Sequence, residues 1–149
     1  MTTLLVSTVT TENEATVKKD TTAQWSKDFP VESHWQIQVL KAVCQLANLR
    51  YDWDSYGSPP ISSVGLTAST RLIAMINPED LPVPQVFPVP SGGIQLEWTV
   101  GQRELEIEIL PDGMIEYLKV EHGQPIEEAQ VRLGAYAQVS SILSWLMSA

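Results

Sequence analysis

The chain has 149 residues, of which 44% are hydrophobic and 18% are charged. It is therefore long enough for one globular domain and too ordinary in composition to be wholly disordered. Its 18 acidic residues outnumber its 9 basic ones, which gives a formal net charge of −9 at pH 7. That balance argues against a general nucleic-acid binder and against binding to anionic membranes, because both depend on clustered Lys and Arg.

The chain contains a single cysteine, Cys44. It cannot form an internal disulfide or a multi-cysteine metal site, and we expect a buried, inert thiol within a helix. The first residues lack the basic stretch and apolar core of a signal peptide. No stretch approaches the roughly 18 apolar residues that span a bilayer. We therefore expect a cytoplasmic protein without a cofactor, a bound metal or a membrane partner.

Residues 1–24 contain eight threonines and almost no large apolar residue after Val9. This composition predicts a flexible arm with little to bury. The segment from Leu4 to Val9 is the exception, because its β-prone residues could add a strand to an exposed sheet edge, here or on a partner. Residues 25–149 are then expected to form one α+β domain.

Apolar residues at helical spacing predict two helices in the first half of this domain. The first begins at Ser33, where the letters SHWQ have the form of a capping box, and ends near Arg50. The second runs from residue 62 or 63 to Ile76, and Pro78 stops it because the residue before a proline is pushed out of the helical region.

The segment between these helices has the spacing of a calcium loop, but Tyr56 stands at the third ligand position and Ser63 at the position of the bidentate glutamate. We therefore interpret it as a turn. Asp52 and Asp54 are expected to cap backbone amides, while Trp53 and Tyr56 pack on neighbouring residues.

Four strands are expected next. Four prolines of equal parity, Pro82, Pro84, Pro88 and Pro90, remove N–H groups from one edge of an extended chain, so about 85–90 is predicted to be an edge strand. A two-residue turn at 101–102 with glycine first, and a three-residue turn ending at Gly113 in the left-handed conformation, join the remaining three. In this register the facing pairs are Val100 with Arg103, Trp98 with Leu105, Leu96 with Ile107, Ile94 with Ile109, Ile109 with Ile115, and Ile107 with Tyr117.

A last helix is expected over about 127–147, since acidic residues in its first turn suit a helix N-terminus. Its apolar stripe comprises Ala135, Val139, Ile142, Leu143 and Leu146. The expected fold is α+β: two N-terminal helices, a four-stranded antiparallel meander and a C-terminal helix, in two layers.

The register that places the apolar residues on one face of the sheet places glutamates on the other. The candidate partner-binding residues on that second face are Glu97, Glu104, Glu106, Glu108, Glu116, Leu118 and Val120. Two pairs of glutamates face each other there, Glu97 with Glu106 and Glu108 with Glu116, and like charges directly opposite destabilise a sheet. The nearby cations, Arg103 and Lys119, have the inward-facing parity.

Three interpretations of this face remain open. It is a solvated surface, a docking face for a basic protein, or a two-carboxylate or divalent-metal catalytic site. Neither His34 nor His122 belongs to a zinc-binding pattern, and the chain has no G-x-S-x-G elbow and no glycine-rich phosphate loop.

Two stretches carry a resemblance: WDSYGSPP from Trp53 to Pro60, and PVPSGGIQLEW from Pro88 to Trp98, followed by EIEI at 106–109. With them, roughly residues 35–121 resemble a group of small bacterial proteins that have no assigned activity. The resemblance implies a bacterial origin and supplies no catalytic residue.

We therefore predict a non-catalytic protein–protein interaction module that presents its acidic face to a basic protein partner and does not bind nucleic acid directly. In its more specific form, the hypothesis is an antitoxin- or immunity-like role. The alternative is a small metal-dependent hydrolase that uses the clustered glutamates.

Overall fold

The structure is a computed structural model that describes residues 34–77, 81–132 and 134–148. All of them belong to one unit, Glu32–Ala149. The arm expected at 1–24 and the capping residue expected at Ser33 lie outside the described residues.

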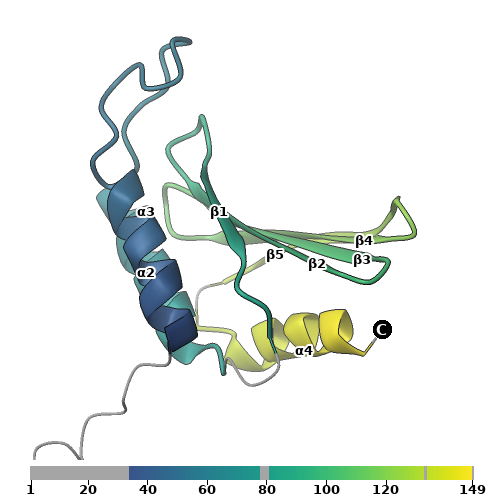
Figure 1. The fold of residues 1–149 in the computed structure, drawn as a ribbon. Coiled ribbons are helices and arrows are strands. Elements are labelled where there is room, and N and C mark those ends of the chain that lie inside the picture. Colours follow the sequence, from purple (N-terminus) through teal and green to yellow (C-terminus); the bar gives the residue numbers. More distant parts are fainter. Residues whose placement is uncertain (1–33, 78–80, 133, 149) are drawn as a thin grey trace, which may run out of the picture. The chain divides into compact units, whose positions relative to one another are not determined.

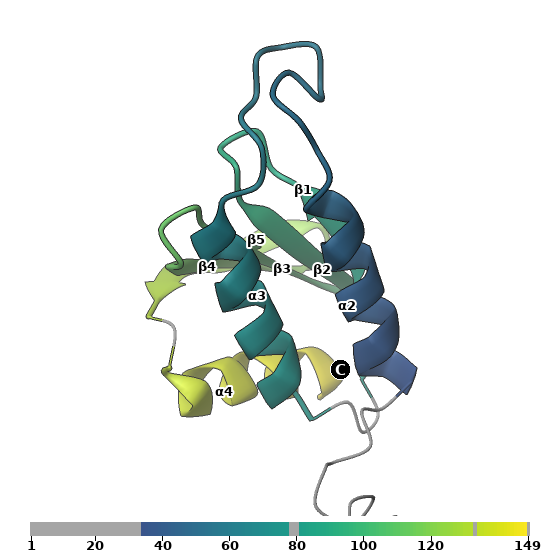
Figure 2. The same cartoon turned by 90° about the vertical axis from the view of Figure 1, so that its left-hand side faces the viewer.

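Within the described residues, two helices are followed by five strands and then by a last helix. The elements are α2 (His34–Leu46), α3 (Ser63–Met75), β1 (Gln85–Pro88), β2 (Ile94–Val100), β3 (Arg103–Ile109), β4 (Ile115–Glu121), β5 (Gln124–Val131) and α4 (Tyr136–Met147). The strands form one antiparallel sheet in the order β1-β2-β3-β4-β5. Helices α2 and α3 lie side by side, and α4 lies against the same face of the sheet (Figures 1 and 2). The α+β class is confirmed.

The sheet has five strands, so the expectation of four was wrong. Residues 124–131, whose second half was assigned to the last helix, return along β4 as β5. The connection is a two-residue turn in which His122 and Gly123 both have positive φ, 52° and 71°, as a type I′ hairpin requires. Glu127 therefore lies in a strand, and the helix begins only at Tyr136, after Gly134 with φ 106°.

The predicted register of β2, β3 and β4 is confirmed pair by pair. Gly101 has φ 60° and Gly113 has φ 87°, which are the conformations the two turns need. A third glycine fits a close approach, since a Cβ on Gly93 would lie 2.6 Å from the carbonyl oxygen of Ile109 on the neighbouring strand. The turn residues thus set which side chains share a face.

Strand β1 lies at an edge of the sheet, as its prolines predict. Just before it, Pro82 is held by two tryptophans from different elements. Trp35 of α2 and Trp98 of β2 donate their indole N–H groups to the Pro82 carbonyl oxygen at 3.0 and 2.9 Å. Both rings are buried and both donors are satisfied, so this contact ties α2 and the sheet to the connection that enters β1.

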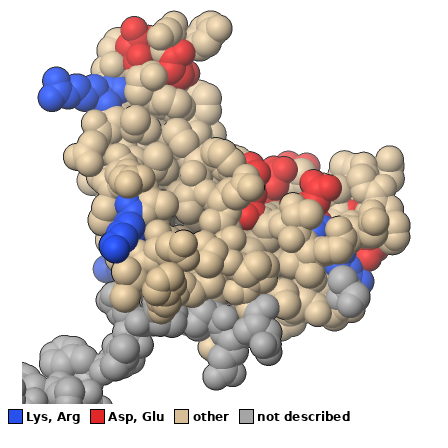
Figure 3. Space-filling model, viewed as in Figure 1, with Lys and Arg blue, Asp and Glu red and all other residues tan. Residues whose placement is uncertain are grey.

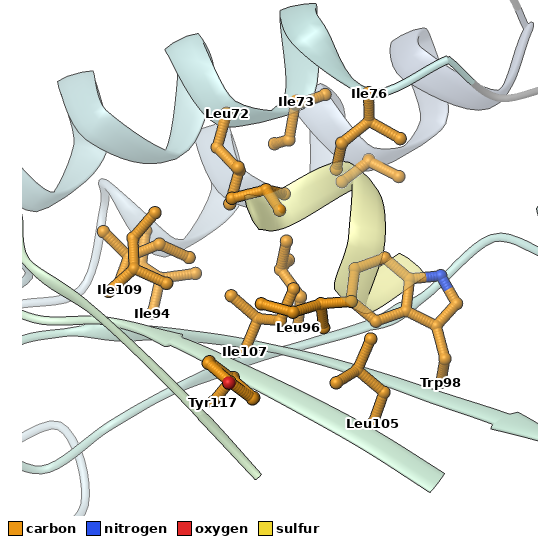
Figure 4. Packing of buried hydrophobic residues seen from close by; sticks show 14 of the residues in the cluster. Leu72, Ile73, Ile76, Ile94, Leu96, Trp98, Leu105, Ile107, Ile109 and Tyr117 are labelled. Atoms are coloured by element: carbon orange, nitrogen blue, oxygen red, sulfur yellow. The ribbon is translucent and has the colours of Figure 1, made fainter. Parts of the chain in front are cut away.

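One hydrophobic core lies between the sheet and the helices (Figure 4). The sheet contributes Ile94, Leu96, Trp98, Leu105, Ile107, Ile109, Ile115, Tyr117 and Val131. The helices contribute Trp35, Val39 and Val43 from α2, Leu72 and Ile73 from α3, and Val139, Ile142 and Leu146 from α4. Cys44 is exposed, contrary to expectation, because it follows Val43 on α2 and lies off the stripe that faces the sheet.

The loop between α2 and α3 projects beyond both helices (Figure 2). Its capping interactions are confirmed: Asp54 Oδ1 accepts from the backbone N–H groups of Tyr56 and Ser58, and Asp52 Oδ1 accepts from that of Gly57. The expected packing of Tyr56 was wrong, since this side chain is 93% exposed. A turn that satisfies its own backbone in this way needs no neighbour to hold its shape.

None of the helices within the described residues has the length and apolar character that a bilayer crossing needs.

Candidate functional site: the acidic face of the sheet

The face of the sheet that points away from the helices carries every residue that the sequence assigned to it. Alternate positions of β2, β3 and β4 bring together Glu97, Glu104, Glu106, Glu108, Glu116, Leu118 and Val120. We call these seven residues, with Glu128 of β5, the acidic face. No described helix covers it, and acidic side chains gather over it on the side away from α4 (Figures 1 and 3).

Like charges lie directly opposite each other on this face, as the register predicted. Glu97 pairs with Glu106 across β2 and β3, and Glu108 pairs with Glu116 across β3 and β4. All four side chains are half-buried rather than fully exposed. Their repulsion is therefore screened less completely than it would be in bulk water.

Among the described residues, neutral groups and not cations donate hydrogen bonds to these carboxylates. Gln95 Nε2 donates to Glu97 Oε1 at 2.7 Å and to Glu106 Oε2 at 3.4 Å, so one amide connects both members of a like-charge pair. Gln130 Nε2 of β5 donates to Glu116 Oε1. These bonds satisfy oxygen atoms but leave the net charge of the face unchanged.

The pKa values of two central glutamates are raised by burial and by the neighbouring carboxylates. Burial, followed by the charges of Glu97 and Glu104, raises the pKa of Glu106 above its ordinary value. Burial, followed by the charge of Glu116, also raises the pKa of Glu108, against the opposing effect of a hydrogen bond from Ser91. Both raised pKa values mean that ionising these carboxyl groups costs more free energy in the folded protein than in water. A nearby cation would reduce that cost.

The two cations of the strands serve the other face. Arg103 Nε lies 2.8 Å from Glu121 Oε1, and its Nη1 donates to the Trp145 carbonyl oxygen and to Ser148 Oγ near the end of α4. Lys119 Nζ lies 2.6 Å from Glu127 Oε2. Both cations also lie over the Trp145 ring, at 5.0 and 5.3 Å from its centroid. Their inward parity is thus confirmed.

Apolar side chains border the carboxylates. Leu118 and Val120 of β4 are half-buried on this face, and Phe87 of β1, which pairs with Gln95, is 41% exposed. Between the glutamates lies a shallow hollow of about 120 Å³ lined in part by Glu108, Glu116, Leu118 and Glu128. Small-molecule sites usually enclose about 300–1,000 Å³, so this hollow suits one inserted side chain better than a whole substrate.

Part of the face was missed by the sequence interpretation. Glu128 and Gln130 reach it from β5, which was assigned to a helix, and Phe87 reaches it from β1. The signal that could have found the first two is the His122 and Gly123 pair after an alternating run, because such a pair favours a hairpin turn over the start of a helix.

The described residues contain no group of three or more His, Cys, Asp or Glu side chains arranged to hold a metal ion. The alternative of a metal-dependent hydrolase stays a prediction.

The chain matches no protein-family model, no curated protein and no solved structure in the three comparisons made. The resemblance to small bacterial proteins accordingly stays a prediction, and the interpretation of the acidic face rests on its geometry and charge.

Proposed function

We propose that the protein is a non-catalytic interaction module that offers the acidic face to a basic protein partner. The observation that carries the proposal is the separation of charge across the sheet. Six glutamates belong to the face that no described helix covers. The only Lys and Arg of the described strands, Arg103 and Lys119, form ion pairs with Glu121 and Glu127 and lie over the Trp145 ring of α4.

A surface that merely keeps the chain in solution gains nothing from uncompensated like-charge pairs. Burial, and after it repulsion between carboxylates, raises the pKa values of Glu106 and Glu108. Lys or Arg from a partner, placed between Glu97 and Glu106 or between Glu108 and Glu116, would relieve that repulsion. Complementary charge also accelerates association and selects among partners. The half-buried Leu118 and Val120 add the apolar contact area that a protein interface needs near its centre.

The partner is expected to be a toxin or a nucleic-acid-associated protein with a basic surface, because such a surface complements the acidic face. The chain then acts in an antitoxin- or immunity-like role. We place this interaction in the cytoplasm, because a chain with one cysteine requires no oxidising compartment.

The test begins with a basic protein recovered from the source organism on the immobilised full chain, followed by titration of the purified pair. Binding is expected to weaken steeply with added salt. Replacing Glu106→Gln with Glu108→Gln is expected to lower the affinity by about tenfold or more. The stronger reversal, Glu97→Lys with Glu106→Lys, is expected to abolish binding while the domain stays folded.

A matched control distinguishes an effect of the acidic face from an effect of the protein's net charge. Gln38→Lys with Gln45→Lys, at exposed positions of α2, changes the net charge by the same two units as the double glutamine variant. It is expected to bind within about twofold of the natural chain, because the added cations lie off the acidic face. An equal loss of affinity in the Glu106→Gln, Glu108→Gln variant and in this control, or no loss in either, would refute the proposal.

A further inference from the structure

A second hollow, larger than the one on the acidic face, lies beside α3. It has a volume of about 480 Å³ and is bounded by the first turns of α3, the turn between β3 and β4, and the end of β5. None of its lining residues belongs to the acidic face. Its volume falls within the range of about 300–1,000 Å³ that small-molecule sites occupy.

Two arginines line this hollow, Arg71 from α3 and Arg132 from the residue after β5. Both are exposed, and in the described part of the chain neither guanidinium group takes part in an ion pair, a hydrogen bond or a ring contact. Arg103, by contrast, has an ion pair and two further acceptors. Two guanidinium groups are therefore available at one place on a chain whose net charge is −9.

One carboxylate shares the lining, but its orientation is set by the backbone. Asp112 Oδ1 accepts a hydrogen bond from the Met114 N–H at 2.9 Å, as an aspartate in a turn commonly does. The charged groups that line the hollow thus leave an excess of one positive charge.

The rest of the lining is largely apolar. Val64 is 51% exposed there, and Ala68 and Met114 lie beside it. In the first turn of α3, the amides of Val64 and Gly65 are not free to bind an anion, because Ser62 Oγ already accepts from both N–H groups. Any charge recognition in this hollow would come from the arginine side chains.

We propose that this hollow binds a small organic anion in which an oxyanion group, carboxylate or phosphate, is carried on a short apolar body. The planar guanidinium groups of Arg71 and Arg132 bind the oxyanion through paired N–H donors. Val64, Ala68 and Met114 contact the apolar body. The site is independent of the proposed partner-binding surface, so either proposal can fail without the other.

The test uses the full chain, labelled with ¹⁵N, and four probes: octanoate, octyl phosphate, 1-octanol and acetate. Octanoate or octyl phosphate is expected to give saturable shifts of amide signals around Gly113 and Arg132, and the tighter of the two identifies the preferred oxyanion. Octanol lacks the charge and acetate lacks the chain, so both are expected to bind at least about tenfold more weakly.

Variants then locate the site. Arg71→Gln with Arg132→Gln is expected to weaken binding of the better probe by at least about tenfold. The control, Lys41→Gln with Arg50→Gln, removes two exposed cations from α2 and the residues after it and is expected to change the affinity by less than about twofold. The proposal is overturned if neither charged probe binds, if octanol binds as well as they do, or if the control weakens binding as much as the arginine variant.

Discussion

The two faces of the sheet are built from the same strands and have opposite composition. On the face toward the helices, Leu105 and Ile107 of β3 are 0% and 1% exposed. Their neighbours in sequence, Glu104, Glu106 and Glu108, point the other way, and the last two face the carboxylates of Glu97 and Glu116. A period of two residues along one strand thus separates the groups that stabilise the fold from the groups we assign to binding.

This difference shows why the chain tolerates like charges in close register. The covered face supplies the apolar burial that holds the sheet together, so the open face is free to carry interactions that are unfavourable in isolation.

The largest difference is expected when one leucine on each face is replaced by alanine. Leu105→Ala removes a fully buried side chain and is expected to lower the free energy of unfolding by about 2–5 kcal/mol. Leu118→Ala, on the acidic face, is expected to lower it by about 1 kcal/mol or less, because that side chain is only half-buried. Urea denaturation of both variants measures the difference. Equal losses would show that something covers the acidic face as thoroughly as the helices cover the other.

Arg103 tests whether the cation on the covered face has a structural role. Arg103→Met keeps much of the apolar stem but removes the ion pair to Glu121, the bond to the Trp145 carbonyl and the contact with the Trp145 ring. We expect a loss of about 1–3 kcal/mol in the free energy of unfolding. Arg50→Met is the control, since Arg50 is exposed and has no partner among the described residues. A loss no larger than the control's would mean that Arg103 is free to neutralise the acidic face.

The smallest expected effect has the opposite sign. Glu106→Gln with Glu108→Gln removes both like-charge pairs and is expected to stabilise the domain by about 0.2–1 kcal/mol per pair at pH 7. Glu104→Gln is the control, because Glu104 faces Thr99 and Val120 rather than a carboxylate and should change stability less. A destabilised double variant would contradict the account of repulsion on this face.

The same double variant has a defined pH dependence. The folded-state pKa values of Glu106 and Glu108 lie above the ordinary value of 4.5. The folded state therefore binds protons more readily, so the natural chain loses stability as the pH rises from 4.5 through those raised values. At about pH 3, well below 4.5, both carboxyl groups are protonated in the folded and unfolded states, and the advantage of the variant should disappear. Denaturation series between about pH 3 and 7 measure this convergence, and a constant difference would show that charge is not its cause.

Much of the acidic face followed from turn chemistry alone. The glycines at 101 and 113 predicted the two turns, and the alternation of apolar and acidic residues then left one register that buries the apolar set. The contribution of β5 did not follow, because Glu127 and Glu128 before an apolar stretch resemble the acidic first turn of a helix. Only pairing with β4 places Glu127 beside Lys119 and Glu128 opposite Leu118.

Local rules thus determined the features that depend on neighbours along the chain: the turns, the parity of each strand and the opposite character of the two faces. Features that join distant segments depended on tertiary packing. Arg103 contacts Trp145, 42 positions further on, and Arg71 and Arg132 line one hollow only because α3 packs beside the end of the sheet. Which cations are paired and which are left free is a property of distance in space, and a pattern of residues along the chain does not specify it.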